Sequence, residues 1–264
     1  MLLSLLNNLS FGVASVFLKP LELAELLGRS MVVDLRRYPD YRSGHIPNAV
    51  SIPFHYFNTL KGLALYPPMG EDLGRLSKRV GGLKEPVILY DEGGCRSACR
   101  VAYTLELLGV EARVLEGGFE GWRKQGFPVE ADGGHPTSLG SKQLSYVKKP
   151  IDKADLLRLL EEDRVLIVDT RHPAQYRAAR IPSSINIPWQ LIFSEDGFLR
   201  GDWRSSVEAV LGLSENVRVV TYCDEGTNSS LVMYALRMAG VEAECYLPSF
   251  NEWGSDPELP KESG

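Results

Sequence analysis

The stretch "IVDTRHPAQYRAARIPSSINIPW", residues 167–189, joins the end of a short apolar run, "VLIVD", to a polar segment with two Ile-Pro pairs. A short apolar run that closes on an acid is typical of a buried parallel strand, so we expect a strand to end at Asp169. Residues 32–54, "VVDLRRYPDYRSGHIPNAVSIPF", repeat this pattern. The shared positions include the pairs Asp34/Asp169, Arg36/Arg171, Tyr41/Tyr176 and Pro47/Pro182.

A second repeat follows in the same order. "YTLELLGVEARVLEGGFEGW", residues 103–122, matches "YALRMAGVEAECYLPSFNEW", residues 234–253. Two ordered matches in a chain of 264 residues predict two copies of one domain. We place the first domain at residues 1–131, a Gly- and Ser-rich linker at 132–147 and the second domain at 148–264. The tail from residue 255 onward is expected to be disordered.

Predicted strands and helices alternate within each copy. In the second copy, "VRVVTY" (217–222) is another apolar run, and "SSLVMYALRMAG" (229–240) has apolar residues at helical spacing. "DKADLLRLLEED" (152–163) predicts an earlier helix with Asp152 as its N-cap. This alternation predicts a parallel sheet with helices on both faces in each domain.

The composition excludes several function classes. A net charge of -5 and the lack of a basic run argue against a nucleic-acid partner. The four histidines are scattered and the sequence has no C-x-x-C pair, so we expect no metal site. The sequence also lacks a glycine-rich phosphate loop, so we expect no nucleotide cofactor. Four cysteines in a chain of this length are typical of reduced thiols in a cytoplasmic protein. They are Cys95, Cys99, Cys223 and Cys245.

The N-terminal stretch, residues 1–20, is apolar but does not have the pattern of a secretory signal peptide. No Lys or Arg precedes Lys19, and Asn7 and Asn8 interrupt the apolar run. No apolar stretch is long enough to predict a membrane span. We therefore expect a first helix or strand that packs on the domain.

Cys223 is the candidate nucleophile. It follows the strand predicted at 217–222, and the loop "CDEGTNS" leads straight into a helix. Ligands of open parallel sheets bind beyond the C-terminal strand ends, and the free N–H groups of a helix N-terminus favour an anion such as a thiolate or a persulfide. Gly226 allows the loop backbone to curl around the sulfur. The competing interpretation is a buried cysteine that acts as a small hydrophobe.

The "D-x-R … Y-R-x-x-x-I-P-x-x-x-x-I-P" blocks, the "C-x-x-G-x-x-S" loop and "LEGGFEGW" together resemble the tandem rhodanese sulfurtransferases over about residues 24–253. The resemblance implies a five-stranded parallel sheet in each domain, an inactive first domain and an active second one. It also implies a ping-pong reaction, in which Cys223 takes sulfane sulfur from thiosulfate or 3-mercaptopyruvate and becomes a persulfide. The sulfur then passes to cyanide or to a thiol acceptor, such as a thioredoxin-like protein. Asp169 and Arg171 would pair at the strand end.

The active loop that the resemblance implies has an unusual charge. Its residues after Cys223 are Asp224, Glu225, Gly226, Thr227, Asn228 and Ser229. Family members that use thiosulfate have a basic loop, and those that use 3-mercaptopyruvate have a small neutral one. A carboxylate about 7 Å from the sulfur costs the thiolate roughly 0.6 to 2.4 kcal/mol at an effective dielectric of 20 to 80. Amide hydrogen bonds to the anion contribute about 1.5 to 3 kcal/mol each, so we expect Cys223 to stay nucleophilic and thiosulfate to be the poorer donor.

Two further positions depart from the family pattern. The arginine that holds the donor's anionic group is replaced by Gln175, and the usual Gly-His before Ile-Pro is Ala179-Arg180. Arg177 and Arg180 lie close by in sequence, and we predict that they bind the donor; exposed surface charge is the alternative. His172 is expected to be a loop residue rather than a general base.

The first copy is predicted to be inactive. Asp91 follows "VILY" at the position where the second copy has Cys223. Cys95 and Cys99 come at the start of the next helix, too far from the strand end for a thiolate site. Cys245 falls within a predicted strand, where packing is its expected role.

Three function classes follow from these residues. The first is a sulfurtransferase. The second is a rhodanese-fold binding or sulfur-relay module with little turnover, which the acidic loop and Gln175 favour. The third is a phosphatase of the same fold, which needs an arginine six residues after its cysteine. Ser229 is the sixth residue after Cys223, so the phosphatase is the least favoured of the three classes.

Overall fold

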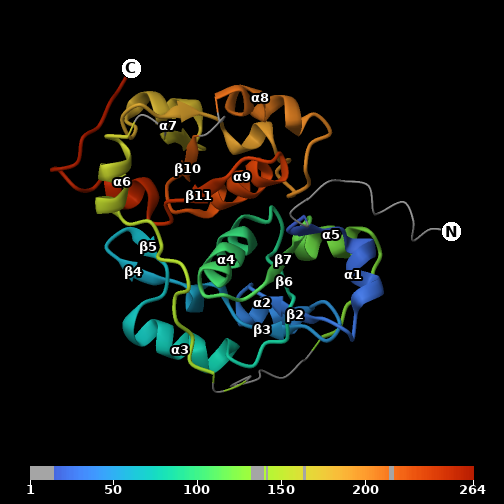
Figure 1. Ribbon diagram of the computed structural model, residues 1–264. Coiled ribbons are helices and arrows are strands. Elements are labelled where there is room, and N and C mark those ends of the chain that lie inside the picture. The colour runs from blue at the N-terminus through green and yellow to red at the C-terminus, as the bar shows by residue number, and fades with distance from the viewer. Residues whose placement is uncertain (1–14, 132–139, 141, 163–164, 214–216) are drawn as a thin grey trace.

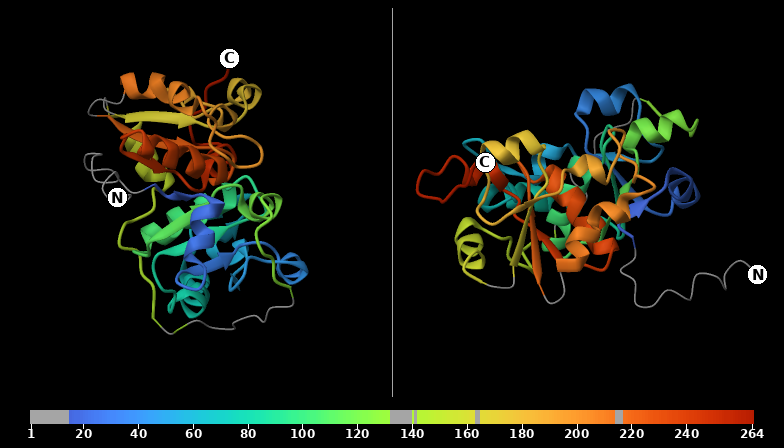
Figure 2. Two further views of the ribbon diagram at one scale, coloured as in Figure 1. Left: turned by 90° about the vertical axis from the view of Figure 1, so that its right-hand side faces the viewer. Right: turned by 90° about the horizontal axis from the view of Figure 1, so that it is seen from above.

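A computed structural model describes residues 15–131, 140, 142–162, 165–213 and 217–264 of the chain. Two α/β domains lie one above the other in Figure 1, with the first copy below and the second above. The side view in Figure 2 shows the same stacking. Both domains have the predicted architecture, in which a parallel sheet carries helices on both faces.

The first domain is built on five parallel strands in the order β1-β7-β6-β2-β3. They are β1 (Phe17–Leu18), β2 (Met31–Asp34), β3 (Val50–Ser51), β6 (Val87–Tyr90) and β7 (Ala112–Leu115). One face packs against α1 (Pro20–Leu26), α2 (Tyr38–Ser43) and α5 (Gly118–Lys124), and the other against α3 (Gly70–Val80) and α4 (Arg96–Leu107). Because side chains alternate along a strand, Val32 faces the first group of helices and Val33 the second.

The second domain has the strand order β11-β10-β8-β9. These strands are β8 (Val165–Asp169), β9 (Ile185–Asn186), β10 (Arg218–Tyr222) and β11 (Ala243–Cys245). Its helices are α6 (Lys153–Leu159), α7 (Pro173–Ala178), α8 (Trp203–Leu213), α9 (Thr227–Met238) and α10 (Ser249–Trp253), with a short 3-10 helix η2 (Trp189–Leu191) after β9. The central strands β8 and β10 pair in parallel with Asp169 opposite Tyr222, so both end at the same edge of the sheet.

The expectation of five strands is right for the first domain and wrong for the second, whose described residues form a sheet of four. In the first domain the fifth strand, β1, precedes α1 and pairs with β7. Among the described residues, the corresponding segment before α6 forms no strand. Lys148 instead reaches the edge strand through its side chain, with Nζ 2.6 Å from Glu244 Oε1.

The two domains share one hydrophobic core. The helices α4 and α9 pack against each other between the two sheets, as Figure 1 shows. Buried residues of both sheets belong to the same cluster, including Leu89 of β6, Val219 of β10 and Leu231 of α9. The interface is therefore continuous with both domain interiors.

A hairpin of the first domain also touches the second. It lies between β3 and α3 and follows the 3-10 helix η1 (Phe54–Phe57); its strands are β4 (Thr59–Lys61) and β5 (Ala64–Tyr66). Tyr66 Oη donates to Glu252 Oε1 at 2.7 Å, and Asn251 Nδ2 donates to the Leu63 carbonyl at 3.0 Å. Both partners in the second domain belong to α10, next to the end of β10.

The predicted cap at Asp152 is confirmed, whereas the prediction of a disordered tail is wrong. Asp152 Oδ1 accepts the N–H of Asp155 at 2.8 Å, a contact worth about 1 kcal/mol to the helix. The tail returns to the domain, where Trp253 Nε1 donates to the Pro260 carbonyl at 2.8 Å and the backbones of Arg180 and Glu262 exchange two hydrogen bonds. These backbone and indole contacts order a segment whose composition alone suggested disorder.

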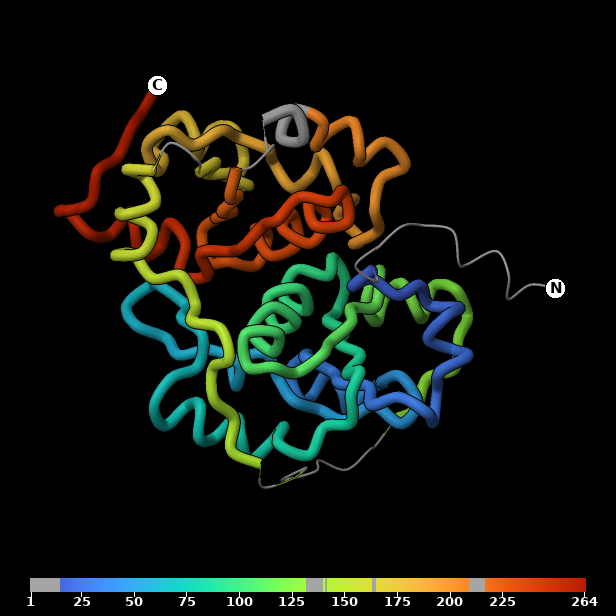
Figure 3. The backbone as a smooth tube through the Cα atoms, in the orientation of Figure 1, coloured from blue at the N-terminus to red at the C-terminus, as the bar shows by residue number. Residues whose placement is uncertain are grey.

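Part of the predicted linker, residues 132–139 and 141, lies outside the described residues, as do residues 1–14 of the N-terminal stretch. The second half of the linker runs along the first domain toward α6 (Figure 3), where the N–H of Leu144 donates to Ser77 Oγ at 3.0 Å. Within the described part of the chain, no helix has the length and apolar character needed to cross a membrane.

Candidate active site

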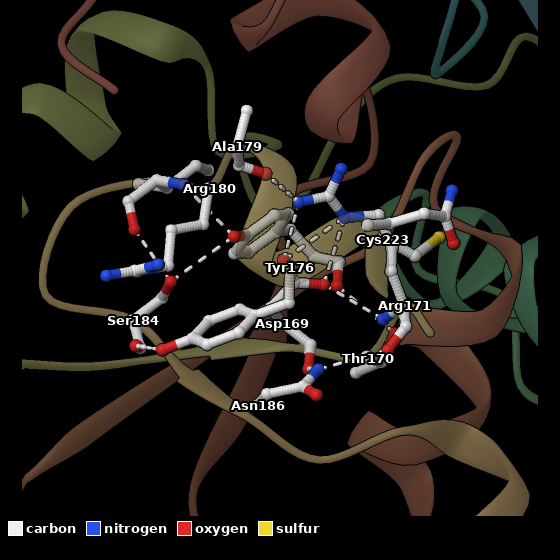
Figure 4. A network of polar contacts seen from close by, with 12 residues as sticks. Asp169, Thr170, Arg171, Tyr176, Ala179, Arg180, Ser184, Asn186 and Cys223 are labelled. Atoms are coloured by element: carbon white, nitrogen blue, oxygen red, sulfur yellow. Dashed lines mark hydrogen bonds and ion pairs between the residues drawn. The ribbon is translucent and has the colours of Figure 1, made fainter. Parts of the chain in front are cut away.

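A buried ion pair organises the end of β8 (Figure 4). Arg171 Nη2 lies 2.7 Å from Asp169 Oδ2 and also donates to the Ala179 carbonyl at 2.7 Å. The guanidinium stacks on the Phe250 ring at 3.9 Å, and the arginine is 3% exposed. Burial works against the charge, but the hydrogen bonds and the negative charge of Asp169 outweigh it and raise the pKa of Arg171. This pair fixes the loop after β8 next to the loop after β10.

Cys223 is the first residue after β10 and is 1% exposed. Its Sγ accepts the N–H of Gly226 at 3.0 Å and lies 3.5 Å from the Ser229 hydroxyl. The N–H of Cys223 donates to Ser249 Oγ at 3.2 Å. The sulfur thus sits inside a turn of its own loop, at the N-terminal end of α9.

Gly226 makes this turn possible. It adopts a φ of +83°, a left-handed conformation that glycine enters without steric cost, and it is the residue from which α9 begins. A Cβ at this position would collide with the Leu247 carbonyl and the Arg100 guanidinium. Any larger residue would therefore open the turn around the sulfur.

The two acids of the loop lie in different surroundings from those that the sequence suggests. Asp224 accepts two hydrogen bonds from Gln175 Nε2, at 3.1 and 3.2 Å, and its Oδ1 is 3.8 Å from Arg171 Nη1. Its side chain is 43% exposed. Glu225 is half-buried, and its backbone carbonyl accepts a hydrogen bond from Arg100 Nη1 at 2.8 Å. Gln175, which stands where the family has an arginine, therefore binds the Asp224 carboxylate of the loop.

The first turn of α9 completes the loop. Thr227 is buried, Asn228 is half-buried, and Ser229 links the two cysteines of this domain. The Ser229 hydroxyl lies 3.2 Å from Cys245 Sγ as well as 3.5 Å from Cys223 Sγ. Cys245 packs in β11 as expected, and burial raises its pKa to about 11.

The two arginines predicted to bind the donor lie on or just after α7. Arg177 is exposed, whereas Arg180 is turned to the C-terminal tail. Arg180 Nε lies 3.3 Å from Glu262 Oε2, and Nη1 donates to the Gly264 carbonyl at 2.9 Å. In the part of the chain that the structure describes, no contact brings either guanidinium to the loop 223–229, so their role in donor binding stays a prediction. His172 accepts the N–H of Ala174 and caps α7.

Sequence reasoning missed the contribution of the first domain. Arg100 lies on α4, has no exposed surface, and reaches across the interface to the Glu225 and Leu247 carbonyls. The only available signal was an arginine within an otherwise apolar helix face, "SACRVA". The repeat gave no further help, because the matching position of the second copy is Leu231.

The corresponding loop of the first domain is filled by its own carboxylate. Asp91 accepts the N–H groups of Cys95, Ser97 and Ala98 at 3.1 to 3.3 Å. Burial raises the pKa of Asp91 to about 6 although these hydrogen bonds oppose the shift. Cys95 and Cys99 are fully buried, and burial raises the pKa of both thiols.

Comparison with known proteins agrees with this geometry. The rhodanese-like domain matches the chain twice, over residues 19–125 and 152–256. A 3-mercaptopyruvate sulfurtransferase of Escherichia coli is 26% identical over 84% of this chain and 85% of its own length, and a thiosulfate sulfurtransferase of Azotobacter vinelandii is 28% identical over 88% and 90%. The crystal structure of SseA from Escherichia coli, described as a 3-mercaptopyruvate sulfotransferase, superposes with a TM-score of 0.73 at 22% identity, covering 89% of this chain and 99% of that one. With two matched domains that span most of its length, the chain belongs to the rhodanese-like family.

Proposed function

We propose that the protein is a sulfurtransferase that moves sulfane sulfur from thiosulfate or 3-mercaptopyruvate, through a persulfide on Cys223, to cyanide or a thiol acceptor. The observation that carries this proposal is the position of Cys223 Sγ, 3.0 Å from the N–H of Gly226 at the beginning of α9. An amide and a helix N-terminus aimed at a sulfur stabilise an anion there. The names of the two sulfurtransferase relatives support the same reaction class.

The proposed reaction has two half-reactions. In the first, the Cys223 thiolate attacks the sulfane sulfur of the donor; the new S–S bond forms as the donor's bond to that sulfur breaks, and sulfite or the enolate of pyruvate leaves with the electron pair. In the second, cyanide or a thiolate attacks the outer sulfur of the persulfide and restores the Cys223 thiolate. The loop amides hold the negative charge on sulfur at each stage.

The acidic loop bears on the choice of donor. Asp224 is bound by Gln175 and lies near Arg171, so part of its charge is compensated before a donor arrives. Glu225, the second acid of the loop, is half-buried. We propose that 3-mercaptopyruvate, with a single carboxylate, is preferred over thiosulfate with its two charges. The described cysteines are all free thiols, as is typical of a protein in a reducing compartment such as the cytoplasm. In that compartment a thioredoxin-like protein would be a suitable thiol acceptor.

Steady-state cyanolysis with thiosulfate and with 3-mercaptopyruvate tests the proposal. Thiocyanate should form with either donor, at a higher kcat/KM with 3-mercaptopyruvate. Intact-protein mass after donor treatment should increase by one sulfur atom, and cyanide should remove that increase. A protein that gains the sulfur but releases it to no small-molecule acceptor would instead be the relay module that Gln175 and the acidic loop favour. A protein that gains no sulfur from any donor contradicts both functions.

A further inference from the structure

One cation of the first domain is built into the active loop of the second. Arg100 has no exposed surface, and its guanidinium makes four hydrogen bonds to acceptors in both domains. Nε donates to Asn58 Oδ1 at 2.8 Å, and Nη2 donates to the Leu65 carbonyl at 2.6 Å, both in the first domain. Nη1 donates to the carbonyls of Glu225 and Leu247, at 2.8 and 2.9 Å, in the second domain.

We propose that Arg100 is the positioning residue of the Cys223 loop, by which the inactive first domain sets the shape and charge of the sulfur site in the second. The inference rests on the proposed function for its catalytic consequence. The effect of Arg100 on the reactivity of the Cys223 thiol can be measured whether or not the protein transfers sulfur.

The geometry of a single peptide group explains how Arg100 acts. The carbonyl of Glu225 and the N–H of Gly226 belong to the same planar trans peptide, in which these two bonds point in opposite directions. Arg100 binds the carbonyl end at 2.8 Å, and Cys223 Sγ accepts from the N–H end at 3.0 Å. Holding the carbonyl away from the sulfur therefore aims the amide at the sulfur.

Glycine makes such a clamp necessary. Gly226 has a φ of +83° and no Cβ, so the backbone gains little from one orientation of the preceding peptide over the flipped one. A flipped peptide would present the Glu225 carbonyl to Cys223, and a carbonyl repels the thiolate and the persulfide. The two-pronged contact of Nη1 with Glu225 and Leu247 selects the productive orientation.

The charge of Arg100 acts in the same direction. The four acceptors described for it are neutral oxygens, and burial lowers its pKa to about 10. The titratable groups whose negative charge would favour this cation are Cys245, Cys223, Glu225 and Tyr146. Further out, the Asp224 carboxylate of the loop lies 3.8 Å from the Arg171 guanidinium. A buried cation without a carboxylate partner is costly, so an anion on Cys223 offsets part of its cost.

The test measures alkylation of Cys223 by iodoacetamide as a function of pH, quantified on the peptide that contains it. Arg100→Met removes both the clamp and the charge. Arg100→Lys keeps the charge but has no planar guanidinium that can bind Asn58 and Leu65 of the first domain while it binds the loop carbonyls. We expect Arg100→Met to lower the alkylation rate at neutral pH about tenfold to a hundredfold, and to move the half-maximal rate to higher pH. Arg100→Lys should fall between Arg100→Met and the wild type.

Arg237→Met is the matched control. Arg237 crosses the same interface to Glu106, at 2.7 Å, but makes no described contact with the loop 223–229. Its loss should lower thermal stability and leave the alkylation profile unchanged. If Arg100→Met does not fold, as judged by circular dichroism, the decision rests on Arg100→Lys. A wild-type alkylation profile in the folded Arg100 variants, or an equal change in Arg237→Met, would overturn the proposal.

Sulfur transfer is measured in the same variants. A parallel fall in kcat/KM for the sulfur donor links the loop to the proposed function. If the wild-type protein transfers no sulfur, the proposed function fails while the alkylation profiles still decide the role of Arg100.

Discussion

The loops after β6 and β10 differ far more than the scaffolds that carry them. Each scaffold has an aspartate paired with an arginine at the end of the neighbouring strand of the sheet, and an aromatic ring under the guanidinium. The residues are Asp34, Arg36 and Phe119 in the first domain, and Asp169, Arg171 and Phe250 in the second. A loop and a helix N-terminus follow each central strand, but Asp91 accepts three backbone N–H groups there in one domain, and Cys223 Sγ accepts the N–H of Gly226 in the other.

This comparison separates the fold from the chemistry. In the first domain the anion of the cradle is a carboxylate fixed by three backbone N–H groups, so the amides have no capacity left for a substrate anion. In the second domain the corresponding position is held by Cys223, whose Sγ accepts the N–H of Gly226. On the proposed function, the side chain at the strand end determines which domain carries the sulfur, and the network around it sets how readily that sulfur reacts.

The largest expected effect is that of Cys223→Ser. A hydroxyl is not ionised at neutral pH and cannot form a persulfide, so sulfur transfer and the added sulfur mass should both disappear. Cys95→Ser and Cys99→Ser are the matched controls, since both thiols are buried in the first domain. A sulfur adduct that persists in Cys223→Ser would assign the chemistry to another thiol.

Asp91 should make the stability of the protein depend on pH. Its pKa in the folded protein is about 6, above the ordinary 3.8, so the folded state binds its proton more tightly than the unfolded state does. Stability from this group is complete below pH 4 and is lost as the pH rises to about 6, an effect of about 3 kcal/mol. Urea unfolding between pH 4 and 7 measures it, and Asp91→Asn should flatten that part of the profile. An unchanged slope in the variant would show that Asp91 does not carry the effect.

Arg177 and Arg180 test whether the donor binds beside α7. Replacement of either by Ala should raise the donor KM or lower kcat/KM by an amount that matches a charge-assisted hydrogen bond of about 1.5 to 3 kcal/mol. Because Arg180 also pairs with Glu262, Glu262→Gln is its control, since this variant removes the ion pair and leaves the arginine in place. Wild-type kinetics in the double replacement would make both residues surface charge.

The smallest effect concerns donor preference. Asp224→Arg with Glu225→Lys should improve thiosulfate relative to 3-mercaptopyruvate by about threefold to sixtyfold, which corresponds to roughly 0.6 to 2.4 kcal/mol for one charge interaction. Salt should narrow the difference between the donors, because exposed charges are screened beyond about 8 Å at physiological ionic strength. Gln175→Ala should move the ratio toward 3-mercaptopyruvate, since it frees the Asp224 carboxylate. If none of these changes alters the ratio of kcat/KM for thiosulfate to kcat/KM for 3-mercaptopyruvate, donor preference is determined outside the loop.

Sequence reasoning worked where the cause is local and failed where it is not. The strand ending at Asp169, the cap at Asp152 and the glycine turn after Cys223 all follow from neighbouring residues, and the structure contains each of them. The contact between Gln175 and Asp224 depends on the meeting of two loops at one sheet edge, which a residue-by-residue comparison with the family does not reveal.

Features that depend on contacts between residues far apart in the sequence could not be predicted. Arg100 is 125 residues away from Glu225 in the sequence, and its partners in the second domain are backbone carbonyls, which residue types do not reveal. The ordered tail depends on its hydrogen bonds with the Trp253 side chain and the Arg180 backbone. In each case tertiary contacts decided a feature that local composition described wrongly.

The core shared by α4 and α9 also constrains how the duplicated halves can evolve. A substitution on the inner face of α4 changes the packing of α9, from whose first turn the sulfur site is built. On the proposed function, the first domain is therefore under selection for the packing that positions Cys223 in the second.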